Sequence, residues 1–357
     1  MSAFANVPGT VDSIAEIDRQ IVELLRRRGE LLLGPDGVEV PLSGIRQTAD
    51  DFAATTAEVA PAWPADVRGV IARGVAAASI FANRRTPTVS YLGPAFSYSY
   101  LAAVRFFSEA ATLVPVQTIA TVFQDVATKR CDFGIVPIEN STDGRVVDTL
   151  STFSEMPLAI CGEVLLPINH CLLGHGPLDR IRTIYSKPQA LSQCRNYLAT
   201  HVPAAATREV SSTTAAVKIA ADDPEAAAVA SYEAGMHFGL NLLARGIEDS
   251  RNNATRFVVI GTRQPEPSGR DKTSLMFQIP HRSGALADAM QVFSQHGLNM
   301  TWIESFPIRG NPNEYLFFVE LEGHRGTPQV AAAIETLVGH TVRLECLGSY
   351  PRSAAAT

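Results

Sequence analysis

The chain has few charged residues, few cysteines and no long apolar run. Only 18% of its 357 residues are charged, with 30 Lys and Arg against 36 Asp and Glu, a formal net charge of −6. This balance argues against a protein that coats nucleic acid or an anionic membrane, because phosphate binding needs a basic excess. No apolar run reaches the ~18–20 residues that a membrane helix needs. A hydrophobic content of 46% excludes disorder of the whole chain.

The five cysteines are scattered and show no CxxC pair or other metal-ligand spacing. An odd, scattered set is typical of reduced core thiols in a cytosolic protein rather than of a disulfide framework. The N-terminus lacks a basic region followed by an apolar stretch, so no secretory signal is indicated. We therefore expect a cytoplasmic protein that binds neither nucleic acid nor membrane, and a small anionic ligand remains open.

The hydrophobic pattern predicts a multidomain protein. Residues 1–86 begin with apolar side chains at helical spacing, stopped by GPDG at 34–37, and further helices are expected at 48–60 and 65–83. A small all-α unit of this kind is expected to dimerise in order to complete its core.

Two further domains follow the helical unit. Residues 87–264 alternate strand and helix patterns, which predicts a mostly parallel α/β fold in two lobes with a ligand cleft between them. After a Pro- and Gly-rich linker at 263–269, residues 270–350 show the βαββαβ order of a ferredoxin-like fold.

Short polar motifs follow the expected strands of the middle domain. They are GPAFSYS at 93–99, PIENST at 137–142, SKPQA at 186–190, SST at 211–213 and NATRF at 253–257. In this order and spacing they resemble the prephenate dehydratases, and the domain order resembles the bifunctional chorismate mutase–prephenate dehydratases. The resemblance implies a periplasmic-binding-like catalytic domain. It also implies conversion of prephenate to phenylpyruvate, with loss of water and carbon dioxide, for phenylalanine synthesis without a metal or cofactor.

The same resemblance assigns roles to individual residues. Thr255 is the catalytic threonine, placed to hydrogen-bond or help protonate the departing hydroxyl, and Phe257 packs the turn. Arg256 is expected to pair with a substrate carboxylate. The expected substrate-binding residues lie at strand ends and helix starts, where hydroxyls and backbone N–H groups face anions. These are Ser97, Tyr98, Ser99, Glu139, Asn140, Ser141, Thr142, Gln189, Ser212 and Thr213.

The motifs depart from the family pattern at three positions. Phe96, Tyr100 and Lys187 stand where the family commonly has Gly, His and His. They support an alternative chemistry, either dehydration of arogenate or decarboxylation without aromatisation. A non-catalytic sensor of an aromatic metabolite is another alternative, because two-lobed clefts joined to regulatory domains also suit sensing. The complete motif at 255–257 favours the enzyme.

The last domain resembles the ACT domains that bind phenylalanine. Its GAL turn at 284–286 lets backbone approach a ligand at a helix start, and ESFP at 304–307 matches the family's Glu-Ser-Arg-Pro except at Phe306. The resemblance implies feedback inhibition by phenylalanine and side-by-side pairing into a homodimer or homotetramer. A structural module without an effector is the alternative. The implied effector residues are Gly284, Ala285, Leu286, Asn299, Glu304 and Ser305.

The first domain resembles an all-helical chorismate mutase with a degenerate site. Arg28 matches one active-site arginine, and Arg46 and Gln47 match a pair on the second helix. Val11 stands where the family has another arginine, and no lysine lies near 37–39. Because that site stabilises its transition state with cations, we expect a mutase remnant kept for dimerisation. Retained activity with other cations is the alternative.

Overall fold

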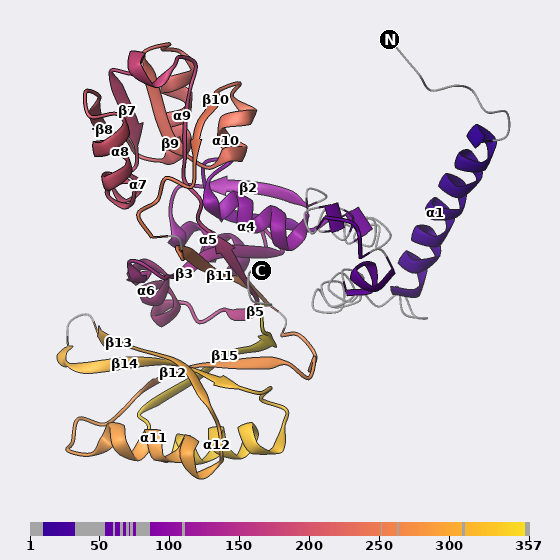
Figure 1. Cartoon of the computed structure of the whole chain (residues 1–357). Helices are drawn as coiled ribbons and strands as arrows, with labels where there is room; N and C mark the ends of the chain where they lie inside the picture. The colour runs from indigo at the N-terminus through magenta and orange to yellow at the C-terminus, as the bar shows by residue number, and fades with distance from the viewer. Residues whose placement is uncertain are drawn as a thin grey trace. The chain divides into compact units, whose positions relative to one another are not determined.

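The computed structural model describes the chain from residue 10 to residue 353 with gaps (Figure 1). The described stretches are 10–32, 86–108, 111–250, 252–262, 264–308 and 311–353, with short pieces between 54 and 75. The chain divides into two units, which are treated separately below. One is Met1–Pro87 with Phe106–Thr112, and the other is Thr88–Arg105 with Leu113–Thr357.

In the first unit the structure describes helix α1 (Thr10–Leu32), where the apolar spacing predicts a helix, and a helical stretch over 54–59. The remainder of the predicted all-α domain lies largely outside the described residues. The apolar side chains of Ile17, Ile21 and Leu24 are between 49% and 65% exposed. The helix therefore presents an apolar face that the described part of this unit leaves open. Among the described helices, none has the length and hydropathy required to span a bilayer.

The second unit begins with a lobe built on the sheet β2-β1-β3-β11-β5, with β4 paired to β3. Its strands are β1 (Thr88–Leu92), β2 (Thr112–Val116), β3 (Phe133–Asn140), β4 (Gly144–Arg145), β5 (Ala159–Pro167) and β11 (Ala254–Gly261). Its helices are α4 (Tyr98–Phe107), α5 (Ile119–Ala127) and α6 (Val147–Glu155). The apolar runs of β3 and β11 are buried almost throughout, which fixes these strands at the centre of the sheet.

The second lobe is built on the sheet β10-β6-β9-β7-β8. Its strands are β6 (Cys171–Gly174), β7 (Thr183–Ser186), β8 (Ala206–Glu209), β9 (Ala226–Ala230) and β10 (Asn241–Arg245). Its helices are η1 (Leu178–Arg180), α7 (Pro188–Gln193), α8 (Arg195–His201), α9 (Thr213–Ala221) and α10 (Tyr232–His237). The small side chains of β9 are all buried at the centre of this sheet.

The prediction of two α/β lobes is confirmed, but the prediction of mostly parallel sheets is wrong. The chain leaves the first lobe after β5 and returns as β11, which inserts antiparallel between β3 and β5. In the second lobe β7 is parallel to β8 and β9, whereas β6 is antiparallel to β9 and β10. Both sheets are mixed because the chain crosses between the lobes twice.

The C-terminal domain confirms the predicted βαββαβ order. Its strands form the antiparallel sheet β13-β14-β12-β15, and a core cluster fills the space between this sheet and its two helices. The elements are β12 (Asp271–Gln278), α11 (Ala285–Gln295), β13 (Met300–Ile308), β14 (Asn311–Glu322), α12 (Pro328–Val338) and β15 (Arg343–Pro351).

The same sheet packs its other face against the first lobe. Met276 and Phe306 share one buried cluster with Ile138 of β3. A Cβ atom at Gly348 of β15 would collide with the backbone carbonyl of Ile160 in β5. β12 is therefore buried on both faces, and strands of the C-terminal domain lie directly beside those of the first lobe.

Candidate active site

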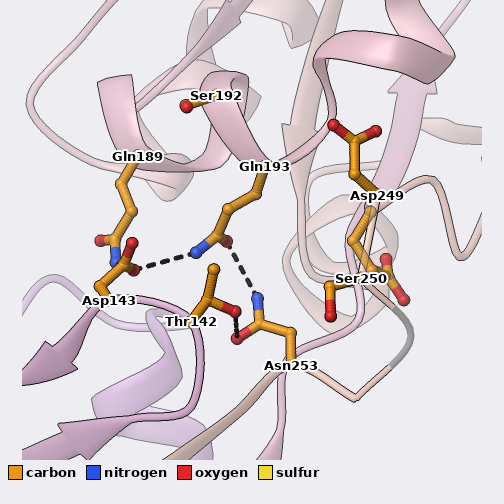
Figure 2. Close-up of a pocket in the computed structure, with 9 residues that line it drawn as sticks. Thr142, Asp143, Gln189, Ser192, Gln193, Asp249, Ser250 and Asn253 are labelled. Atoms are coloured by element: carbon orange, nitrogen blue, oxygen red, sulfur yellow. Dashed lines mark hydrogen bonds between the residues drawn. The ribbon is translucent and has the colours of Figure 1, made fainter.

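A cavity of about 540 Å³ lies where residues of the two lobes meet (Figure 2). One wall follows β3, another is formed by α7, and the remainder comes from the segment that leads back into β11. The described lining residues are Thr142, Asp143, Gln189, Ser192, Gln193, Glu248, Asp249, Ser250 and Asn253. Its size suits a small organic molecule.

Asn140 and Thr255 meet beside this cavity, each almost fully buried. The Asn140 side-chain oxygen accepts the backbone N–H groups of Thr142 and Asp143, at 2.9 and 3.0 Å. Its Nδ2 therefore faces the other way and donates to Thr255 Oγ1 at 2.8 Å and Asn253 Oδ1 at 3.0 Å. The register of β3 with β11 places Asn140 opposite Thr255, so two separate motifs form one hydrogen-bonded group.

Gln193 connects the two lobes across the cavity (Figure 2). Its Nε2 donates to Asp143 at 3.0 Å, and its Oε1 accepts from Asn253 Nδ2 at 3.0 Å. Gln189 also donates to Asp143. The motif SKPQA includes Gln189, and NATRF begins with Asn253 but suggests no role for it, whereas Gln193 and Asp143 lie outside the motifs. Because Gln193 lies four residues after Gln189 on α7, helical spacing alone places both side chains on one face.

Behind Gln193 lie two aromatic side chains, the buried His170 and the partly buried Tyr98. His170 Nε2 lies 3.1 Å from Gln193 Oε1, and His170 Nδ1 lies 3.1 Å from the Tyr98 hydroxyl. Because Gln193 Oε1 can only accept, Nε2 of a neutral His170 carries the proton and Nδ1 accepts from Tyr98; the carbonyl of Asn169 lies 3.0 Å from the same hydroxyl and competes for its single proton. Burial lowers the pKa of His170 and raises that of Tyr98 well above its usual value. A neutral chain of hydrogen bonds thus runs from Thr255 to Tyr98, and both lobes contribute to it.

The cavity is acidic. Asp143, Glu248 and Asp249 line it, and none of the described lining residues carries a positive charge. The other described lining residues are neutral: the hydroxyl-bearing Thr142, Ser192 and Ser250, and the amides Gln189, Gln193 and Asn253.

The structure brings several predicted substrate-binding residues together. Thr142 and Gln189 line the cavity, and Asn140 contacts Thr255. Ser141 is hydrogen-bonded to the backbone that leads into Thr255, so it holds that strand start in place. The PIENST motif thus supplies both cavity lining and support.

Other predicted substrate-binding residues lie outside the described lining. Ser97 bonds to the backbone of its own turn, and Ser99 is buried. Ser212 accepts the N–H of Ala215 and caps α9, and Thr213 is the first residue of that helix. In the structure described here, Ser97 and Ser212 shape the turns in which they lie.

The positions that depart from the family pattern also lie outside this lining. Phe96 adopts a left-handed backbone with φ of 64°, and its ring stacks on His237 of the second lobe with centroids 3.9 Å apart. The Tyr100 ring contacts the Phe96 ring, with centroids 4.9 Å apart. Lys187 is exposed before α7. Phe96 and Tyr100 therefore form part of an aromatic contact between the lobes.

Arg256 lies on the opposite side of β11 from Thr255, because successive strand residues face opposite ways. Its guanidinium is 8% exposed and contacts the carboxylates of Glu139, Glu163 and Glu320. Arg256 and Glu139 are absent from the described cavity lining. Phe257 is buried, as expected for a packing residue.

The effector residues implied by the resemblance lie at two places in the C-terminal domain. Gly284 has φ of 81° and precedes α11, where Ala285 is buried and Leu286 exposed. On β13, Glu304 pairs with Arg145 of the first lobe at 2.8 Å. Ser305 is exposed, and the Asn299 carbonyl accepts a backbone N–H from β14.

Of the mutase residues, the structure describes Arg28, which is partly buried on α1. Burial lowers its pKa. Arg46 and Gln47 lie outside the described residues.

Comparison with known proteins supports the same architecture. The family model for prephenate dehydratase matches residues 89–265, and that for the ACT domain matches residues 273–339. A bifunctional chorismate mutase/prephenate dehydratase of Aquifex aeolicus is 43% identical over 266 residues, 74% of this chain and 74% of the relative. One of Neisseria gonorrhoeae is 39% identical over 274 residues, 76% of each chain.

Two solved structures have the same arrangement. Prephenate dehydratase of Arthrobacter aurescens, in complex with L-Phe, is 32% identical with a TM-score of 0.69, covering 74% of this chain and 90% of that one. GqqA, described as a quorum-quenching acylase, is 31% identical with a TM-score of 0.68, covering 75% and 98%. From the family matches and the curated relatives, the chain belongs to the prephenate dehydratase family, in the form that carries a C-terminal ACT domain.

Proposed function

We propose that the chain converts prephenate to phenylpyruvate, water and carbon dioxide in phenylalanine synthesis. The hydrogen bond of 2.8 Å between Asn140 and Thr255 carries this proposal. This bond joins the threonine of the NATRF motif to the asparagine of the PIENST motif, beside a cavity of suitable size. Family membership supports the substrate.

The direction of that hydrogen bond determines what Thr255 can do. Asn140 donates to the threonine oxygen, so the threonine proton points to another acceptor. In the reaction, the electron pair of the bond to the departing carboxylate enters the ring as carbon dioxide leaves. The hydroxyl takes up one proton from solvent and leaves as water, so the prephenate dianion and one proton give the phenylpyruvate monoanion, carbon dioxide and water. Threonine is a weak acid, so Thr255 acts as a positioned donor that stabilises the departing hydroxyl.

The acidic cavity suits the loss of a carboxylate. A fixed cation would stabilise the carboxylate of the substrate more than the neutral carbon dioxide that it becomes, and would slow its departure. Neutral donors such as Thr142 and Ser250 hold the substrate without this cost.

The test is to incubate the purified chain with prephenate and, separately, with arogenate, and to follow product by ultraviolet absorbance. We expect phenylpyruvate from prephenate, at a higher kcat/KM than any turnover of arogenate. A reversed preference identifies the altered chemistry. Binding of prephenate without turnover identifies a sensor, and either result contradicts the proposal.

We further propose that phenylalanine binds the ACT domain and inhibits the enzyme. The left-handed Gly284 at the start of α11 supports this, because it exposes backbone N–H groups to a carboxylate. Phenylalanine is expected to raise the Tm through binding linkage and to inhibit turnover, whereas alanine should do neither. Equal responses to the two amino acids would favour a structural module.

For the first domain we propose a mutase remnant that supports a homodimer or homotetramer. The exposed apolar face of α1 supports a role in association. Light scattering is expected to give a dimer or tetramer, and chorismate should turn over slowly or not at all. Turnover of chorismate at an ordinary enzymatic rate would establish the bifunctional alternative.

A further inference from the structure

Arg256 belongs to a buried cluster of charged side chains on the side of β11 that faces away from Thr255. Its Nε lies 3.1 Å from Glu139, and its Nη1 contacts Glu163 at 3.5 Å and Glu320 more closely. Lys272 Nζ lies 2.9 Å from Glu163 and 3.3 Å from Glu320. Glu163 and Glu320 are 2% and 1% exposed, so this part of the cluster is buried, whereas the Glu139 side chain is 36% exposed at its edge.

The opposite charges in this cluster favour the ionised forms of Arg256 and Glu163. Burial alone would lower the pKa of Arg256, but the carboxylates of Glu320 and Glu163 raise it. Burial would raise the pKa of Glu163, but Lys272 and Arg256 lower it. Removing one side chain would leave the opposite charges of its partners buried without compensation. The observed arrangement is therefore strongly favoured.

The cluster leaves Arg256 unsuited to bind substrate. Arg256 already contacts the carboxylates of Glu139, Glu163 and Glu320, so its charge is neutralised within the protein rather than offered to a substrate carboxylate. The indole ring of Trp302 lies 4.9 Å from the guanidinium carbon, and the buried Nη2 atom of Arg256 has no hydrogen-bond partner among the described residues. A cation over an indole face is stabilised by the ring.

The cluster spans the boundary between the catalytic and ACT domains. Arg256 and Glu163 come from the first lobe, whereas Lys272 and Glu320 come from β12 and β14 of the ACT sheet. Within that sheet Glu320 is paired in register with Trp302 of β13. The Arg256 side chain is therefore held by both domains, with Glu139 and Glu163 from the first lobe and Glu320 and Trp302 from the ACT sheet.

Arg256 transmits this position to Thr255 through a single peptide bond. The pairing of β11 with β3 is irregular between Arg256 and Phe257, where a bulge aims side chains out of the regular alternation. A second contact from the ACT sheet reaches β4, which is paired with β3. Glu304 of β13 pairs with Arg145 of β4, and Arg145 lies opposite Glu139.

We propose that Arg256 is a positioning residue: it holds Thr255 in its catalytic orientation through the buried cluster, and it makes that orientation depend on the ACT sheet. The inference rests on the proposed dehydratase function and deepens it by naming the contact that regulates the site. Glu320 is the partner through which the ACT sheet acts on Arg256.

The test compares E320Q with E322Q, two identical substitutions on the same strand. Glu322 pairs with Arg352 at the surface, so it serves as the matched control. We expect E320Q to lower kcat about tenfold while the KM for prephenate stays within about twofold. Inhibition by phenylalanine should weaken as well. E322Q should behave as wild type in all three measurements.

R256K supplies a second test that preserves the charge and therefore the fold. It should retain more kcat than R256Q, because a cation at this position still neutralises the carboxylates. An E320Q variant with the kcat and phenylalanine response of E322Q would overturn the inference, as would R256K and R256Q of equal kcat. If the wild-type chain forms no phenylpyruvate, the proposed function itself fails. If the wild type is active but E320Q behaves as E322Q does, only this inference fails.

Discussion

The side chains on the two faces of strand β11 make different kinds of contact, although Thr255 and Arg256 belong to one short motif. Thr255 accepts a hydrogen bond from the neutral Asn140 amide beside a cavity, whereas Arg256, the next residue, lies among charged side chains shared with the ACT sheet. A side chain in neutral surroundings can exchange a hydrogen bond with a ligand at small cost. A buried ion pair cannot be broken so cheaply. This difference supports the proposal that the Thr255 face serves the reaction and the Arg256 face holds the strand in position.

The largest expected effect comes from removing the donor on the cavity face. T255V keeps the shape of the side chain but loses its hydroxyl, so kcat should fall at least about a hundredfold, ~2.7 kcal/mol of transition-state stabilisation. T255S keeps the hydroxyl and should retain most of the activity. Steady-state kinetics with prephenate measure both, and an unchanged kcat in T255V would break the comparison.

A smaller loss is expected from reversing the hydrogen bond to Thr255. N140D keeps the oxygen that accepts the N–H groups of Thr142 and Asp143 but replaces the donor with a second acceptor. Thr255 must then donate to residue 140 instead of the substrate, and we expect kcat to fall about thirtyfold, ~2 kcal/mol. N241D, on the exposed start of β10, controls for the added charge. Equal kcat in the two variants would contradict the assigned hydrogen-bond direction.

The next prediction tests the close contact between the first lobe and the ACT sheet, where β15 packs against β5. G348A places a methyl group against the carbonyl of Ile160, so it should lower the free energy of unfolding by about 1–2 kcal/mol. It should also weaken inhibition by phenylalanine. G339A, where a Cβ finds only ordinary contacts, is the control. Denaturant unfolding of the two variants measures the difference, and identical curves would show that the close approach carries no stability.

The smallest expected effects are changes in stability with pH, which differ between the hydrogen-bonded chain beside the cavity and the buried charged cluster. The pKa of His170 is lowered by burial, so the unfolded chain binds a proton that the folded chain does not, and stability should fall as pH drops below about 6.5. The pKa of Glu163 is lowered in the fold, so its contribution is present above about 4.5 and lost as pH falls further. H170Q should flatten the first decline and E163Q the second. Unfolding curves across pH 3–8 measure both, and a single shared transition would contradict the assignment.

The sequence predicts the domain order and the central pair of the site. Its motifs predict Thr255 and Asn140 as site residues because the family pattern is nearly complete there. Their roles stay a prediction, and the structure shows that the two side chains are hydrogen-bonded. The ferredoxin-like domain is likewise predictable, since its strands and helices alternate with clear hydrophobic patterns.

Other features depend on contacts between distant segments. His170 and Asp143 carry no local signal, because only the meeting of the two lobes brings them near Gln193. The antiparallel insertion of β11 depends on the chain crossing between lobes, which hydrophobic alternation does not reveal. Alternation along the strand does place Arg256 opposite Thr255, but the charge of an arginine alone suggests a substrate carboxylate.

The most direct measurement of the central claim is the pair of kinetic constants of R256Q with prephenate. A positioning residue affects the transition state through Thr255, so kcat should fall at least about tenfold while KM stays within about twofold of wild type. A KM raised tenfold or more with kcat unchanged would show that Arg256 binds the substrate, and would contradict the division between the two faces of β11.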